Sequence, residues 1–250
     1  MSDVAVAELT GNVGPFPEPP LRSCRGYKGS RALFHAAADQ FGVELTDEES
    51  YDWAVVLGGS MLLDHLVDVE QVDITGPFQE ITSGHFRDDL SRDIQVRFAN
   101  FMHRQDEQGR QALLDGVKSV DELARSQRNA ETVQEIIDIR REEADLLASF
   151  LKLPTDGLLD ASARKEFNRW VNSWSRVGYM MDSLFDIKQD YENGEVGLRP
   201  TLSDRIKLAK AAAEESVVAI KRTPPSLFGK CVLNGMRYVV FNMKLPVTEE

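Results

Sequence analysis

The chain has 250 residues, of which 42% are hydrophobic and 28% charged, and its formal net charge at pH 7 is −12. This composition is that of a soluble globular protein, and the length allows one domain with a sizeable core. The negative charge argues against nucleic acids and anionic membrane surfaces as partners. Two cysteines, Cys24 and Cys231, are too few for a disulfide framework or a zinc site.

The apolar segments bear on where the protein is found. Residues 1–20 lack the basic region and the apolar core of a signal peptide. The longest apolar stretch, Trp53 to Leu63, is too short to cross a bilayer as a helix. We therefore expect a cytoplasmic protein without a membrane span, and we leave a homodimer open.

Residues 1–27 are rich in Pro and Gly and are expected to form an irregular N-terminal arm, after which almost every segment has the apolar period of a helix. Thr46 and Glu49 form a capping box at the start of one such segment, and Asn193-Gly194 is a typical C-terminal cap of another. In chain order, the expected helices cover residues 30–42, 46–70, 87–105, 108–153, 160–193, 202–221 and 226–243.

Segments that alternate with a period of two are scarce, and the long β-branched runs of buried strands are absent. The sequence contains no internal repeat and no low-complexity linker that would separate two domains. These observations predict an all-α fold, with a single domain over residues 28–245.

Two acidic stretches contain the candidate functional residues. The first, LGGSMLLDHLVDVE, places Asp64 and Asp68 four residues apart, and the second, MMDSLFDIKQD, places Asp182, Asp186 and Asp190 at the same spacing. Side chains four apart on a helix are neighbours, and like charges there cost a few tenths of a kcal/mol per pair. Open solvent or a bound cation would each relieve this repulsion.

Both stretches end a face that is otherwise apolar or small: Leu57, Ser60 and Met61 precede Asp64, while Val171, Ser175, Gly178 and Tyr179 precede Asp182. A solvated acidic face would continue as Glu, Lys and Gln. One Asp-x-x-x-Asp pair alone is usually a surface feature, but two such pairs predict carboxylates that converge at the mouth of an apolar cavity. Hard oxygen ligands suit Mg²⁺, whereas His65 is the only histidine nearby, so a transition metal is disfavoured.

At this point the sequence resembles the isoprenoid synthase superfamily. Paired Asp-x-x-x-Asp stretches far apart in a helical chain are typical of it, and DSLFDIKQDYENGEVGLRP is similar to the corresponding segment of squalene and phytoene synthases. Chain size and motif separation most resemble the compact prenyltransferases of moenomycin biosynthesis and class IB terpene synthases. The resemblance implies a helical bundle around a central apolar cavity. The first motif departs from the family pattern, because His65 stands where many relatives have an aspartate.

The resemblance also implies roles for individual residues. Asp64, Asp68, Asp182 and Asp186 would be catalytic and, with Asp190, would hold Mg²⁺ on the diphosphate of a C15 or C20 allylic substrate. The carbocation left after diphosphate release would cyclise or lose a proton. The residues expected to bind the substrate are basic (Arg125, Arg128, Lys188, Arg199) or line the pocket (Leu57, Met61, Phe98, Phe101, Ser175, Tyr179).

Two alternatives stay open. The prenyl cation could pass to a second substrate, as in the moenomycin-type or phytoene-synthase-like enzymes. Capture by isopentenyl diphosphate would need a second anion site, and the sequence shows no basic cluster for one. Alternatively, the chain could be a non-catalytic helical binding domain whose acidic faces are merely solvated.

Overall fold

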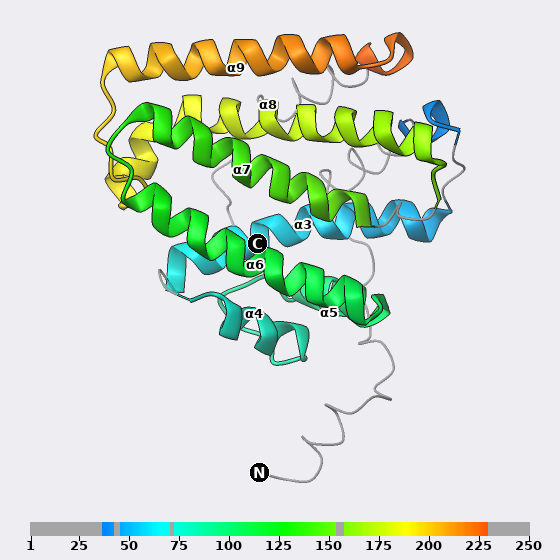
Figure 1. Cartoon of the computed structure of the whole chain (residues 1–250). Helices are drawn as coiled ribbons and strands as arrows, with labels where there is room; N and C mark the ends of the chain where they lie inside the picture. Colours follow the sequence, from blue (N-terminus) through cyan, green and yellow to red (C-terminus); the bar gives the residue numbers. More distant parts are fainter. Residues whose placement is uncertain (1–36, 43–45, 71–72, 154–157, 230–250) are drawn as a thin grey trace.

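The computed structural model describes residues 37–42, 46–70, 73–153 and 158–229, and all regular secondary structure in these ranges is helical (Figure 1). The all-α prediction is therefore confirmed for this part of the chain. No helix within it is long and apolar enough to cross a membrane. The expected N-terminal arm and the last expected helix beyond residue 229 lie outside the described residues. The main helices are α3 (Asp47–Glu70), α4 (Thr75–Thr82), α5 (Arg92–Arg104), α6 (Glu107–Arg128), α7 (Val133–Lys152), α8 (Ala161–Asn193) and α9 (Leu202–Arg222).

The boundaries predicted for α8 are confirmed. At its start, Oδ1 of Asp160 accepts hydrogen bonds from the backbone N–H groups of Ser162 and Ala163 at 2.8 and 2.9 Å, which satisfies donors that a helix leaves unpaired. At its end, Gly194 adopts the left-handed conformation with φ 81°, which a glycine tolerates without steric cost. The sequence thus determines both ends of the helix that carries the second acidic stretch.

The long stretch predicted as helical over residues 108–153 is divided in the structure into two helices, α6 and α7. Thr132 begins the second helix: its hydroxyl accepts from the N–H of Glu135 at 3.2 Å, and the Glu135 carboxylate accepts from the N–H of Thr132 at 2.9 Å. This reciprocal capping box stabilises a new helix start within a segment whose apolar period continues through it.

The helix predicted over residues 87–105 begins later, at Arg92. The buried amide of Gln95 holds residues 87–90 in a turn instead. Its oxygen accepts from the N–H of Arg87 at 2.8 Å, and its nitrogen donates to the carbonyls of Arg87 and Leu90 at 2.8 and 3.0 Å. These hydrogen bonds give the backbone groups of Arg87 and Leu90 the partners that they would otherwise find within a helix. The preceding helix α4 was not predicted.

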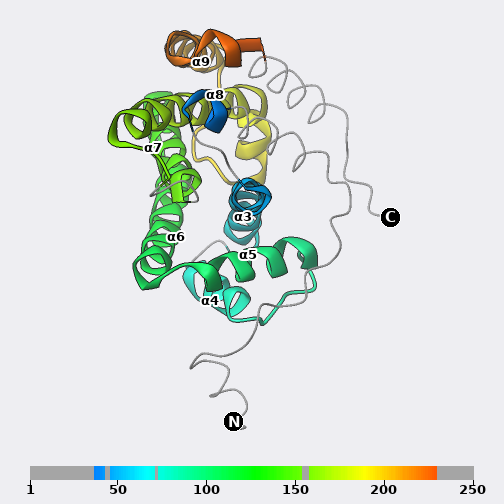
Figure 2. The same cartoon turned by 90° about the vertical axis from the view of Figure 1, so that its right-hand side faces the viewer.

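Helices α5, α6, α7 and α8 form an arc around α3, and α9 lies on the outer side of α8 (Figure 2). One apolar cluster joins α3 to its neighbours and contains Trp53, Phe98, Phe101 and Trp170. A second cluster packs α7, the C-terminal half of α8 and α9. Phe98 and Phe101, expected to line a cavity, are buried in the first cluster with 3% and 0% of their surface exposed. A central cavity remains a prediction.

Glycine brings α3 and α5 close together. A Cβ atom at Gly59 of α3 would overlap the ring of Phe98 on α5, whereas a Cβ at Gly178 of α8 would meet no atom within 4 Å. The same substitution should therefore have opposite effects on stability at these two helical positions.

We predict that Gly59→Ala lowers the free energy of unfolding by about 1–3 kcal/mol, because the added methyl group displaces the Phe98 ring. The control Gly178→Ala should leave stability unchanged or raise it by up to about 1 kcal/mol, since alanine favours the helix. Urea unfolding followed by circular dichroism measures both. Equal stability of the two variants would contradict the close approach of α3 and α5.

Candidate functional site

The second acidic stretch lies in the C-terminal half of α8, where its three aspartates differ in exposure. Asp182 is half-buried, Asp186 is exposed, and Asp190 is buried with 8% of its surface exposed. A carboxylate rarely loses contact with water unless it gains a partner. Asp190 is therefore expected to have a cationic partner on a neighbouring helix.

That partner is Arg140 of α7. Its guanidinium lies 2.9 Å from a carboxylate oxygen of Glu143 and 3.3 Å from one of Asp190, and the three side chains are only 12–13% exposed. Its Nε atom is buried and has no hydrogen-bond partner among the described residues. Arg140 thus links α7 to α8 at the acidic stretch and keeps one donor uncommitted.

The surroundings raise the pKa of Asp182 to about 6. Burial is the largest cause, and the charges of Asp186, Asp64 and Glu143 act in the same direction, while Arg140 opposes them. The pKa of Asp190 is likewise raised to about 6, chiefly by burial and against the effect of Arg140. Crowded negative charge disfavours the ionised form of each carboxyl group.

Asp64 of the first acidic stretch lies near enough to the second stretch for its charge to act on Asp182. Asp64 belongs to α3 and Asp182 to α8, yet the charge on Asp64 raises the pKa of Asp182. The same carboxylates act on Tyr179. Burial is the largest cause that raises the pKa of its hydroxyl, and the charges of Glu143, Asp64 and Asp182 act in the same direction. Tyr179 therefore stays protonated at neutral pH and can donate a hydrogen bond.

The remaining predicted residues are dispersed. Arg125 pairs with Asp121 at 2.5 Å on α6, and Lys188 pairs with Glu192 at 3.3 Å on α8, each on its own helix. Arg199 is exposed and Ser175 is half-buried. The side chains of three residues on α3 lie outside the described residues: Asp68, Leu57 and Met61.

Arg128 differs from the other predicted basic residues. It lies at the end of α6, where its carbonyl group abuts Gly197 in the loop that follows α8. Its Nη2 atom is buried, and the described part of the chain provides no hydrogen-bond partner for it. Arg128 and Arg140 therefore each retain a buried donor.

Sequence reasoning missed Arg140 and Glu143, although a signal was present. Ile136, Arg140, Ala144 and Ala148 follow one another at helical spacing, and all but the arginine are apolar. In the structure those three are buried, so Arg140 belongs to the inward face of α7. An arginine within an apolar stripe indicates a buried ionic contact.

Within the described ranges, no group of three or more His, Cys, Asp or Glu side chains has the geometry of a metal site. Two surface hollows of about 460 and 530 Å³ lie on α6, α7 and α8. Neither is lined by Asp64, Asp182, Asp186 or Asp190. What the site does offer is a set of carboxylate oxygens from α7 and α8 around one buried guanidinium, with Asp64 of α3 near enough for its charge to act on Asp182.

We predict that Arg140→Met lowers the free energy of unfolding by about 3 kcal/mol at pH 8, because it leaves buried carboxylates without their cation. The loss should shrink below pH 6. Arg140 lowers the pKa values of Asp182 and Asp190, so its removal raises them further and both groups become neutral as the pH falls.

Thermal and urea unfolding at pH 8 and pH 5 measure this effect. Lys118→Met is the control, because Lys118 pairs with Asp115 on an exposed part of α6; this substitution should leave the free energy of unfolding nearly unchanged at either pH. A loss for Arg140→Met that is the same at both pH values would contradict the electrostatic role of Arg140.

Comparisons with known protein families, with curated proteins and with solved structures find no match to this chain. The resemblance to isoprenoid synthases therefore stays a prediction, and any function rests on the side chains of the chain itself.

Proposed function

We propose that the protein is a Mg²⁺-dependent enzyme of the terpene synthase type, which ionises a C15 or C20 allylic prenyl diphosphate and releases diphosphate. The proposal rests on the placement of Asp64 on α3 near enough to Asp182 on α8 for its charge to raise the pKa of that carboxyl group. The resemblance of the two acidic stretches assigns these two residues to opposite sides of one metal site.

The carboxylate oxygens are of the ligand type that suits Mg²⁺. This ion prefers carboxylate oxygens, keeps several waters and commonly bridges to substrate phosphates. Asp64, Asp182 and Asp186 would hold it, whereas Asp190 already contacts Arg140. When bound, the ion would stabilise the negative charge that develops on the diphosphate leaving group.

The protein's own residues would position the leaving group. The buried Nε atom of Arg140 and the Nη2 atom of Arg128 are donors that could be satisfied by diphosphate oxygens. The protonated hydroxyl of Tyr179 supplies a further donor beside Asp182. Such fixed donors stabilise charge that appears during the reaction at little reorganisation cost.

The alternative of a non-catalytic domain with solvated acidic faces is less well supported. Solvated carboxylates keep pKa values near 4, whereas those of Asp182 and Asp190 are raised to about 6. Asp190 is moreover buried against Arg140. Prenyl transfer to a second substrate would use the same ionisation step, so it remains the alternative fate of the carbocation.

We predict that Asp64→Asn and Asp182→Asn each reduce Mg²⁺-dependent release of diphosphate from farnesyl or geranylgeranyl diphosphate by at least about a hundredfold, because the metal loses a ligand. Asp115→Asn makes the same chemical change on the exposed face of α6 and should leave the rate unchanged. Products identified by gas chromatography–mass spectrometry, with and without cell extract as acceptor source, separate cyclisation from transfer. Near-normal release by both site variants would rule out the proposed metal site.

Mg²⁺ uptake should also release protons at pH 6. A group with a pKa of about 6 is half-protonated there, and a metal ligand must be ionised. Calorimetric titration in buffers of different ionisation enthalpy should therefore detect release of a fraction of a proton per site at pH 6 and almost none at pH 8. Asp182→Asn should reduce the release at pH 6; a release that is unaffected would show that Asp182 is not a ligand.

A further inference from the structure

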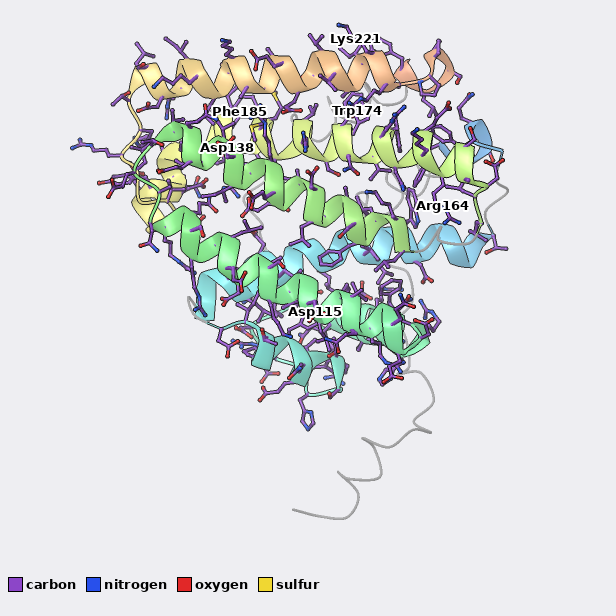
Figure 3. All side chains as sticks on the ribbon, in the orientation of Figure 1. Asp115, Asp138, Arg164, Trp174, Phe185 and Lys221 are labelled. Atoms are coloured by element: carbon purple, nitrogen blue, oxygen red, sulfur yellow. The ribbon has the colours of Figure 1, made fainter. Side chains whose placement is uncertain are left out.

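The outer side of α9 carries an exposed apolar stripe. The opposite side of this helix packs toward α7 and α8 through Leu208, Ala211 and Ala212, and α9 is the outermost of the labelled helices in both ribbon views (Figures 1 and 2). In Figure 3 the side chain of Lys221, beside one end of the stripe, points away from α8. Six exposed apolar side chains form the stripe: Leu202, Ile206, Ala209, Ala213, Val217 and Ile220.

The stripe is continuous along the helix. Its spacing of three or four residues places all six side chains within an arc of about 80° and over a length of about 27 Å. The four large members have between 46 and 76% of their surface exposed. Single exposed apolar side chains are ordinary, whereas a contiguous apolar patch is typical of an interaction surface. A stripe at helical spacing is the pattern through which one helix packs on another.

The sizes of the side chains in the stripe are symmetric about its centre. The two alanines lie in the middle, with Leu202 and Ile206 before them and Val217 and Ile220 after them. When a second α9 lies antiparallel on the first, Leu202 meets Ile220, Ile206 meets Val217, and the small alanines meet at the centre, where they let the helix axes come close. A twofold contact requires a surface that is complementary to itself, and the stripe satisfies this requirement.

The charges beside the stripe favour the antiparallel orientation. Lys210 and Glu214 lie on one flank of the stripe, 3.8 Å apart, and Arg205 lies on the other flank. In an antiparallel pair, the flank with Lys210 and Glu214 faces the same flank of the second copy, so each lysine comes opposite a glutamate. A parallel pair in register would instead place Lys210 opposite Arg205, a residue of like charge.

We propose that the apolar stripe of α9 binds a second copy of this chain, in an antiparallel contact with twofold symmetry. Burial of the large aliphatic side chains of both copies supplies the favourable free energy. One pair of helices makes a smaller interface than the roughly 1,200–2,000 Å² of stable complexes. The dimer therefore forms reversibly, with a dissociation constant on the order of 10 µM. The inference goes beyond the proposed function and does not depend on it.

Sedimentation velocity of the full chain tests the proposal, and we expect the wild-type protein to change from monomer to dimer between about 1 and 300 µM. Ile206→Lys/Val217→Lys brings lysines opposite each other in the contact and should weaken association at least about a hundredfold. Gln111→Lys/Gln134→Lys adds the same charge at exposed positions of α6 and α7 and should change association less than about twofold. All four positions are exposed, so the variants should fold, which circular dichroism checks.

Charge reversal tests the orientation. Lys210→Glu and Glu214→Lys each bring like charges together in the antiparallel dimer and should weaken it about three- to tenfold. An equimolar mixture of these two variants restores opposite charges across the contact and should associate like the wild-type protein. The proposal is overturned if the wild-type protein stays monomeric, whether the stripe is then bare or covered by another part of the chain. It is also overturned if Ile206→Lys/Val217→Lys associates as well as the Gln111/Gln134 control, or if Lys210→Glu fails to weaken association.

Discussion

The contact of Arg140 with Glu143 and Asp190 allows α7 and α8 to pack with acidic side chains between them. Burying those carboxylates without a cation would cost several kcal/mol, and a buried guanidinium without its carboxylates would be as unfavourable. The packing of Ile136, Ile187 and Met180 beside them in one apolar cluster depends on this neutralisation. Since carboxylates outnumber this cation, the same contact leaves a site that attracts further positive charge.

Several helix boundaries can be predicted from the capping residues in the sequence. Asp160 and Gly194 determine α8 because caps act through the nearest backbone groups. The break between α6 and α7 was missed because apolar periodicity continues through it, although Thr132 and Glu135 form a recognisable box. Gln95 could not be interpreted from sequence, since its role depends on the turn that its amide closes.

The candidate site was predictable in part. The spacing of Asp182, Asp186 and Asp190 on one helix follows from sequence, whereas their relation to Asp64 depends on how α3 and α8 pack. Arg140 was missed because its neighbours, Arg141 and Glu142, make the segment resemble a solvated face. Buried charge is a property of tertiary packing, and only the apolar spacing around residue 140 indicates it.

The length of helix α8 determines how its C-terminal aspartates are oriented relative to its N-terminal half. Its caps set its length at 33 residues, and each residue turns the helix by about 100°. One residue inserted between Trp170 and Asp182 would rotate the aspartates away from Arg140, or else Trp170 away from the first apolar cluster. Length changes of about seven residues nearly restore the orientation. Related chains that keep both ends should therefore vary in this helix by whole pairs of turns and otherwise conserve its length.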